Sequence, residues 1–313
     1  VDSITINDAV RSCDNDGVLD NGEIGLVTVK LRNVGTLPIA ATATLSDDSG
    51  TLSFPRGNTI SFVSAGPFKS AMGSVLVTLK GAPSKVVVNL RVSIDAANLA
   101  KPGPVSFSRS FVQNYDLVAA SSASDSMDDS AALWTTGGDT KLDQSVPWVQ
   151  LHDELGGRWA ITDDAAPSDQ WVISPALQVS TSGSFGFALR HRYSFEFDTT
   201  NNYDAGVIEI STDDGATWKD VGTPFTKNGY GGVVWSENAP LKGRNAFVGT
   251  SAGYPSYLTT LADFGSAYQG KTVRLRFRVG TDPAAGGPGW ELDDLQFSGI
   301  DNLPFPSRRA GAR

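Results

Sequence analysis

Hydrophobic and polar residues alternate along much of the chain. The alternation is clearest in residues 27–32, 41–45, 86–94 and 273–279. A repeat of two is typical of β-strands that bury one face, whereas a helix shows a repeat of 3.6. Clusters of Gly, Pro, Asp and Ser separate these segments and indicate turns. The pattern therefore predicts an all-β chain, in which residues 258–268 could form one short helix.

Aromatic residues divide the chain into two parts. All seven Trp residues lie beyond residue 130, and neither Trp nor Tyr occurs before Tyr115. This distribution predicts two cores of different composition, in agreement with the usual length of roughly 150 residues per domain. Residues 1–115 have the length and strand spacing of an immunoglobulin-like β-sandwich. Residues 116–301 suit a larger β jelly roll, and residues 302–313 are expected to be a C-terminal tail, either a linker or a processing stub.

Composition argues against several classes of function. The chain has 34 acidic and 25 basic residues, and its net charge of −9 makes nucleic acid a poor partner. No apolar run approaches the roughly 18 residues of a membrane span. The single Cys13 excludes an intrachain disulfide, and two His residues leave little material for a zinc site. Neither a starting Met nor a signal-like segment is present, so we expect a piece of a longer protein.

One short motif resembles a catalytic signature. Residues 249–253 read Gly-Thr-Ser-Ala-Gly and formally match the G-x-S-x-G motif of serine hydrolases. That motif requires a helix directly after the serine and a histidine later in the chain. Pro255 follows instead, and both His152 and His191 come earlier. Carboxylate pairs that could hydrolyse glycosides are numerous, but the sequence favours none of them. We therefore expect a glycine-rich turn here and no catalytic site.

An acidic segment near the start offers candidate metal ligands. Asp14, Asp16, Asp20 and Glu23 place four carboxylates within ten residues, and calcium prefers such oxygen ligands. The spacing does not match an EF-hand, because Gly17 and Glu23 occupy the wrong positions of that loop. The alternative is a turn in which the Asp side chains accept hydrogen bonds from nearby backbone N–H groups. Both interpretations remain open at this point.

Several motifs occur in an order that is known from secreted bacterial proteins. Residues 14–23, followed by Leu-Arg-Asn-Val-Gly at 31–35, resemble the immunoglobulin-like modules of secreted bacterial hydrolases. The later motifs are residues 171–177, 190–196, 204–211, 213–218, 243–249, 274–278 and 289–295. Their series resembles the MAM-like jelly-roll region that follows the catalytic domain of metallopeptidases of the fungalysin and immune-inhibitor-A type.

This resemblance implies a secreted, non-catalytic accessory region that positions or stabilises a catalytic domain, its expected partner. The zinc-binding H-E-x-x-H motif of those peptidases is absent, because His152 and His191 stand far apart in the sequence.

A second set of acidic residues is spread over the later part of the chain: Asp125, Asp128, Glu196, Asp204, Asp293 and Asp294. The resemblance implies that the Asp293–Asp294 pair lies at a structural cation site. Independently, Asp293 lies two and four residues before Leu295 and Phe297, and alternate residues of a regular strand lie on the same face. This parity argument predicts that Asp293 points inward. An unpaired carboxylate is costly there, so it needs a cation, an arginine or several backbone donors. We expect bound calcium, with Glu196 and Asp204 as further ligands and Asp125 and Asp128 at the domain entrance.

Two other groups of residues are candidates for binding. Tyr230 and Trp235 lie in Gly-rich loops, where aromatic rings could stack on a polysaccharide or a cell-surface glycan, although core packing would explain them equally well. Arg274, Arg276 and Arg278 share one face of a predicted strand. That stripe is either a solvated sheet surface or a docking face for an acidic partner.

Overall fold

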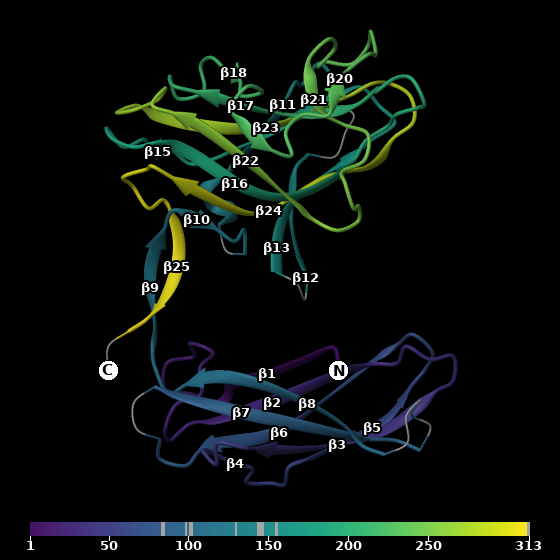
Figure 1. The fold of residues 1–313 in the computed structure, drawn as a ribbon, viewed down its shortest axis with the longest axis vertical. Coiled ribbons are helices and arrows are strands. Elements are labelled where there is room, and N and C mark those ends of the chain that lie inside the picture. Colours follow the sequence, from purple (N-terminus) through teal and green to yellow (C-terminus); the bar gives the residue numbers. More distant parts are fainter. Residues whose placement is uncertain are drawn as a thin grey trace. The chain divides into compact units, whose positions relative to one another are not determined.

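A computed structural model describes residues 1–82, 85–97, 99, 103–128, 130–142, 147–153 and 156–311. In these residues strands alternate with turns, and the helical content is a single 3-10 turn at Ala131–Leu133. The expected all-β chain, a sandwich followed by a larger jelly roll, is confirmed (Figure 1). The chain separates into two compact units. Unit 1 is Val1–Ala119 with the residues from Arg308 onward, and unit 2 is Ala120–Ser307.

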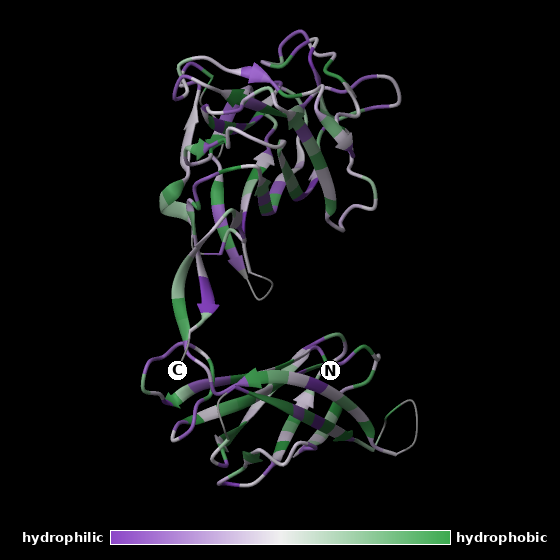
Figure 2. Cartoon of the chain, turned by 60° about the vertical axis from the view of Figure 1, so that its left-hand side comes forward, coloured by the Kyte–Doolittle hydropathy of each residue, from purple (hydrophilic) through white to green (hydrophobic). Residues whose placement is uncertain are grey.

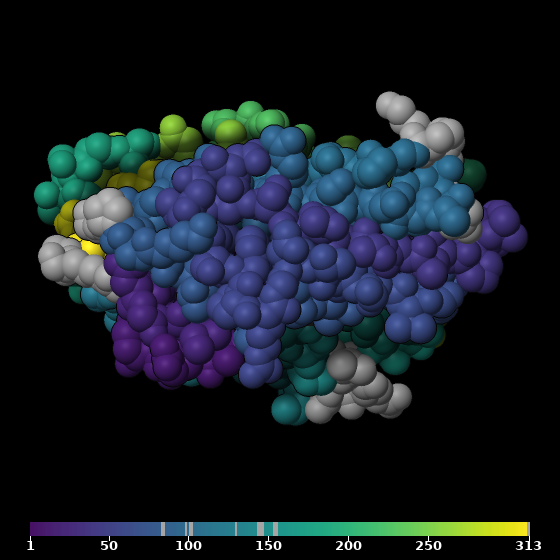
Figure 3. All heavy atoms as spheres, turned by 90° about the horizontal axis from the view of Figure 1, so that it is seen from below, coloured from purple at the N-terminus to yellow at the C-terminus, as the bar shows by residue number. Residues whose placement is uncertain are grey.

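Unit 1 is a sandwich of antiparallel sheets. In the described residues, one sheet has the order β1 (Ser3–Arg11), β2 (Ile24–Arg32), β6 (Ser70–Leu79) and β4 (Leu52–Ser53). The other has the order β5 (Thr59–Ala65), β3 (Ile39–Asp47), β7 (Val86–Asp95) and β8 (Val105–Gln113). Colouring by hydropathy shows the alternation along these strands (Figure 2). The inward positions form one mainly aliphatic core. Figure 3 shows the closely packed outer surface of this unit.

Unit 2 contains two larger sheets in its described residues. The first has the order β12 (Val149–Asp153), β13 (Gly156–Asp163), β24 (Gly287–Ser298), β16 (Phe185–Ser194), β22 (Leu258–Gly265) and β19 (Phe225–Lys227), with β10 (Ser124–Asp125) paired to β24. The second has the order β11 (Thr135–Gly138), β14 (Ser168–Ile173), β23 (Thr272–Thr281), β17 (Ala205–Ser211), β21 (Asn245–Val248) and β20 (Gly232–Val233). The short strands β15 (Leu177–Gln178) and β18 (Lys219–Asp220) pair with β23 and β17.

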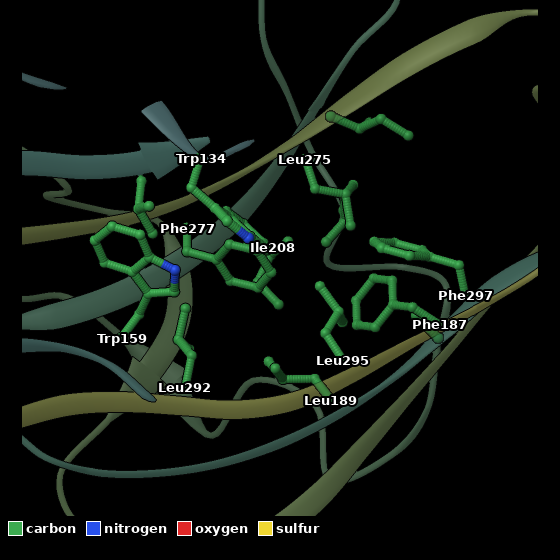
Figure 4. Packing of buried hydrophobic residues seen from close by; sticks show 14 of the residues in the cluster. Trp134, Trp159, Phe187, Leu189, Ile208, Leu275, Phe277, Leu292, Leu295 and Phe297 are labelled. Atoms are coloured by element: carbon green, nitrogen blue, oxygen red, sulfur yellow. The ribbon is translucent and has the colours of Figure 1, made fainter. Parts of the chain in front are cut away.

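The two sheets of unit 2 share one aromatic core. Trp159 and Leu292 come from the first sheet, Ile208 and Phe277 come from the second, and their side chains meet between the ribbons (Figure 4). The prediction of a short helix at residues 258–268 is wrong for most of this segment, because residues 258–265 form β22, which alternates buried and exposed positions. None of the helical segments that the structure describes has the length and hydrophobicity of a membrane-spanning helix.

The end of the chain differs from the expected tail. Strand β25 (Phe305–Ala310) pairs with β9 (Leu117–Ser122) in a two-stranded sheet. Phe305 is 1% exposed, and its ring lies 6.0 Å from Phe297 and 6.3 Å from Trp134. The sequence did not predict this strand, because Phe305 is a single aromatic residue followed by Pro306 and the segment shows no alternation of hydrophobic and polar residues. The unit boundaries accordingly fall at 119/120 and 307/308 rather than at 115/116 and 301/302.

We predict that Phe305→Ala destabilises unit 2 by about 3–5 kcal/mol, because it removes a buried ring and leaves a cavity. The melting temperature of unit 2 should fall by roughly 10 °C. Leu303→Ala is the matched control, since Leu303 is 54% exposed and its truncation should change stability by less than about 0.5 kcal/mol. Differential scanning calorimetry compares the variants; equal melting temperatures would contradict the role of Phe305.

Candidate metal centre

Four carboxylates meet where strands of both unit 2 sheets end. Asp163 is the last residue of β13, and Glu196 lies just after β16. Asp204 directly precedes β17, and Asp282 directly follows β23. Glu196, Asp204 and Asp282 each offer one oxygen, and these oxygens lie within 4.8 Å of one another. Asp163 joins them, because its Oδ2 accepts a hydrogen bond of 2.7 Å from the backbone N–H of Glu196. We call these four residues the acidic cluster.

The acidic cluster is buried and only partly hydrogen-bonded. Asp204, Asp163 and Asp282 are 0%, 3% and 5% exposed. Asp204 Oδ1 accepts a bond of 2.6 Å from the Asp282 backbone N–H. In contrast, Asp204 Oδ2, Asp163 Oδ1 and Glu196 Oε2 are buried without a hydrogen-bond partner among the described residues. An unpaired buried carboxylate is strongly unfavourable. With all four carboxylates ionised, the cluster therefore lacks a positively charged or donating group at its centre.

The burial changes the acidity of these groups. Desolvation, and then the hydrogen bond and repulsion from Asp163, raise the pKa of Asp204 to about 9. Desolvation also raises the pKa values of Asp163 and Glu196. Without a cation, Asp204 is consequently protonated at neutral pH. A divalent cation would have the opposite effect, because it favours the ionised carboxylates.

The donor set fits a hard divalent cation. Calcium takes six to eight oxygen ligands, and the converging oxygens of Glu196, Asp204 and Asp282, with Asp163 beside them, supply several of these. The surrounding chain is packed closely: a Cβ at Gly286 would overlap the backbone oxygen of Asp163, and one at Gly287 would lie 2.9 Å from the Ser194 backbone oxygen. Asp163, Glu196, Asp204 and Asp282 are thus the residues that could hold calcium, which would supply positive charge there.

Sequence reasoning identified half of this cluster. Glu196 and Asp204 were candidates, and the structure brings them together. Asp163 and Asp282 were missed. A usable signal was present, because each stands in a Thr-Asp pair at the end of a β-strand.

Asp293 and Asp294 lie apart from the candidate centre as ion-pair partners of Arg190. The parity argument failed because the pairing of β16 with β24 shifts register between Leu189 and Arg190. Asp294 has a φ of 24°, and Leu292 and Leu295 are both buried with two residues between them. A bulge of this kind adds one residue to a strand and reverses the parity beyond it. Of the three alternatives, the structure shows an arginine, and Asp293 also accepts a backbone bond of 2.8 Å from Asp294.

Asp125 and Asp128 hold the segment that leads into unit 2. Asp125 is buried and accepts three hydrogen bonds, from Met127 N at 2.8 Å, Ser130 Oγ at 2.8 Å and Trp134 Nε1 at 2.7 Å. Asp128 accepts a bond of 2.6 Å from the backbone N–H of Gly157. These are structural contacts within the fold.

The acidic segment of unit 1 is bonded largely to its own backbone. Glu23 accepts hydrogen bonds from the backbone N–H groups of Cys13 at 2.7 Å and Asp20 at 2.8 Å. Asp16 accepts from Val18 N at 2.8 Å, and Asp14 accepts weakly from Asp16 N at 3.4 Å. These contacts have the form of the turn alternative. The calcium hypothesis for Asp14, Asp16, Asp20 and Glu23 stays a prediction.

The two aromatic candidates have different environments. Tyr230 is packed against Phe225 and Phe247, and its hydroxyl donates to Ile208 O at 3.1 Å and accepts from Ile208 N at 2.9 Å. It is therefore a packing residue of the core. Trp235 is 56% exposed, and its ring lies 5.8 Å from that of Tyr203, edge to face.

The positive charges of Arg274, Arg276 and Arg278 on β23 are each compensated by a carboxylate. Arg274 pairs with Asp214 at 2.5 Å, and Arg278 pairs with Asp169 at 2.6 Å. Arg276 pairs with Glu209, which is buried. Because each guanidinium already has a carboxylate partner, this face has no excess positive charge for an acidic partner.

His191 and the G-x-S-x-G serine are also structural. His191 is buried; its Nδ1 accepts a bond of 2.9 Å from Trp290 Nε1, so its Nε2 donates to Thr260 Oγ1 at 2.7 Å. Desolvation lowers the pKa of His191 to about 3. Ser251 is buried and accepts a bond of 3.2 Å from Tyr193 N, and turns rather than a helix follow it.

No protein-family model matches the chain, and no curated protein matches it. Among solved structures, the K1 cleaved adhesin domain of Lys-gingipain from Porphyromonas gingivalis W83 is 14% identical over 58% of this chain and 98% of that one, with a TM-score of 0.32. The module TmCBM61, solved with β-1,4-galactotriose, is 10% identical over 53% of this chain and 87% of that one, with a TM-score of 0.30. A structure of carbohydrate-binding modules from the β-sandwich superfamily is 12% identical over 95% of this chain and 96% of that one, with a TM-score of 0.30.

We predict that, in EDTA, unit 2 loses stability as the pH rises from about 4 towards 9. Between the ordinary pKa of 3.8 and the folded value of about 9, native Asp204 binds a proton that the unfolded chain releases. Stability therefore decreases with pH, by up to about 1.4 kcal/mol per unit for one group. Asp204→Asn, which cannot titrate, should flatten this slope, whereas Asp301→Asn at an exposed turn should leave it unchanged. Melting curves at several pH values provide the test; equal slopes in wild type and Asp204→Asn would contradict it.

Proposed function

We propose that this chain is a non-catalytic, secreted binding region whose second unit binds a neutral saccharide next to a structural calcium ion. The observation that carries the proposal is the exposed Trp235 and its edge-to-face contact with Tyr203, which we call the aromatic pair. Tryptophan is highly buried on average, and Trp and Tyr are enriched at interfaces because each has an apolar ring and a polar group. The apolar face of a pyranose ring stacks well on such a ring.

Polar groups surround the aromatic pair. Asp198 accepts hydrogen bonds from the Tyr203 hydroxyl at 2.5 Å and from the backbone N–H groups of Thr200 and Asn201, both at 2.7 Å. Exposed Glu237 and Asn238 follow Trp235 closely in the chain. An apolar platform with a few polar groups at its margin is typical of small-ligand sites. Asp198 is acidic and Glu237 is paired with Lys242, so this surface has no excess positive charge, and a neutral polysaccharide suits it better than an anionic one.

The acidic cluster is assigned a structural role in this proposal. Calcium held by Asp163, Glu196, Asp204 and Asp282 would cancel their repulsion and join strand ends from both sheets. The buried position of Asp204 and Asp282 supports a stabilising role.

We further propose that the region is an accessory part of a secreted bacterial peptidase, with the parent catalytic domain as its partner. Support for this parentage comes from the ordered motifs between residues 171 and 295. In that context, saccharide binding would bring the peptidase to a polysaccharide or a cell-surface glycoprotein.

We predict that millimolar calcium raises the melting temperature of unit 2 above its value in EDTA. A ligand that binds only the native state at a hundredfold excess over Kd adds about 2.7 kcal/mol, or roughly 5 to 10 °C. Asp204→Asn should abolish this response. Asp293→Asn should retain it, because Asp293 pairs with Arg190 instead. The proposal of a calcium site would be abandoned if wild type melted identically in both buffers.

We predict that Trp235→Ala weakens saccharide binding at least tenfold, a loss of about 1.4 kcal/mol. Affinity gel electrophoresis in soluble β-1,4-galactan, xylan and dextran measures retention, with polygalacturonate as the anionic comparison. Phe68→Ala is the control, since Phe68 is also exposed but belongs to unit 1. Absence of wild-type retention in all neutral polysaccharides, or equal retention of Trp235→Ala, would contradict the proposed function.

A further inference from the structure

The acidic cluster and the aromatic pair are joined by one short hairpin. Residues 195–204 connect β16 to β17, and the hairpin within this connection runs from Glu196 to Asp204, which are both members of the cluster. The hairpin is closed by backbone bonds from Tyr203 N to Glu196 O at 3.1 Å and from Asp198 N to Asn201 O at 2.9 Å. Phe197 and Asn202 form an antiparallel bridge between them. The separation of the two cluster residues therefore sets the geometry of the hairpin.

Both rings of the aromatic pair depend on this hairpin. Tyr203 belongs to it and directly precedes Asp204. Trp235 is attached to it, because the Trp235 backbone N–H donates to Asn202 O at 2.8 Å and Val234 forms a parallel bridge with Asn202. A change at the base of the hairpin would thus move Tyr203 directly and would loosen the support of Trp235.

The acidic cluster supplies a reason for such a change. Glu196 and Asp204 lie at the two ends of the hairpin, and with the carboxylates ionised, buried oxygens of Asp204 and Asp163 have no hydrogen-bond partner among the described residues. Without a cation, and even with a proton on Asp204, the charges of Asp163 and Asp282 repel Glu196 and disfavour the closed base of the hairpin. A divalent cation between Glu196 and Asp204 attracts both carboxylates and therefore draws the two ends of the hairpin together.

We infer that a divalent cation in the acidic cluster controls saccharide binding by the aromatic pair, acting through the hairpin and without contact between cation and sugar. The inference rests on the proposed function of the aromatic pair. Indirect action is favoured because Asp204 and Asp282 are buried, whereas Trp235 is exposed to solvent. Coupling free energies between two sites typically correspond to about 5- to 150-fold in affinity.

The test combines hydrogen exchange with binding. The full chain is compared in millimolar calcium and in EDTA by exchange mass spectrometry and by affinity electrophoresis in β-1,4-galactan, xylan and dextran. In EDTA we expect the amides of residues 197–203 to exchange at least tenfold faster, while β16 and β24 stay protected. Retention should weaken about tenfold in parallel. Asp204→Asn should show no cation response in either measurement, and Asp293→Asn should respond as wild type does.

Three results would overturn the inference. The first is unchanged exchange in the hairpin on removal of calcium. The second is exchange in β16 and β24 that becomes as fast as exchange in the hairpin, because loss of the cation would then unfold the whole unit and not loosen the hairpin within a folded unit. The third is a hairpin whose hydrogen exchange changes on removal of calcium while saccharide retention stays equal in both buffers. If no polysaccharide is retained even with calcium, the proposed function fails, and the exchange measurement still decides whether a cation controls the hairpin.

Discussion

Burial of like charges at the ends of four strands is the constraint on which the rest of unit 2 depends. Asp163, Glu196, Asp204 and Asp282 come from four separate segments, and folding of the aromatic core brings them together. The core is favoured by the burial of apolar area, whereas the cluster opposes it through desolvation and repulsion. A proton on Asp204 relieves part of this cost, and a divalent cation would relieve more. In our proposal, the stability of unit 2 and the shape of the hairpin between β16 and β17 depend on what occupies that position.

Two other carboxylates of unit 2, Glu209 and Glu291, are compensated by arginines within the protein. Glu209 is buried with Arg244, Arg276 and Arg278 around it, and Glu291 accepts two bonds from Arg192. Such pairs are satisfied without any ligand. This contrast is the reason why we propose the acidic cluster as the position of an external cation.

Sequence alone predicted much of the fold and part of the site, for reasons visible in particular residues. Period-two alternation in segments such as 273–279 gave the strands, because one face of each is buried. Strand β25 was missed because Phe305 contributes a single buried ring without alternation. Asp293 was misplaced because a bulge in β24 reverses its parity. Asp163 and Asp282 were missed because convergence of strand ends is a property of sheet topology, which local patterns do not contain.

The most direct test of the central claim is the metal content of the purified chain. After equilibration with calcium and removal of free ions, elemental analysis of wild type should find calcium bound to unit 2. The Asp163→Asn and Asp204→Asn variants should each lose one equivalent relative to wild type, whereas Asp293→Asn should lose none. Absence of calcium from wild type, or its full retention by both cluster variants in their folded state, would contradict the account.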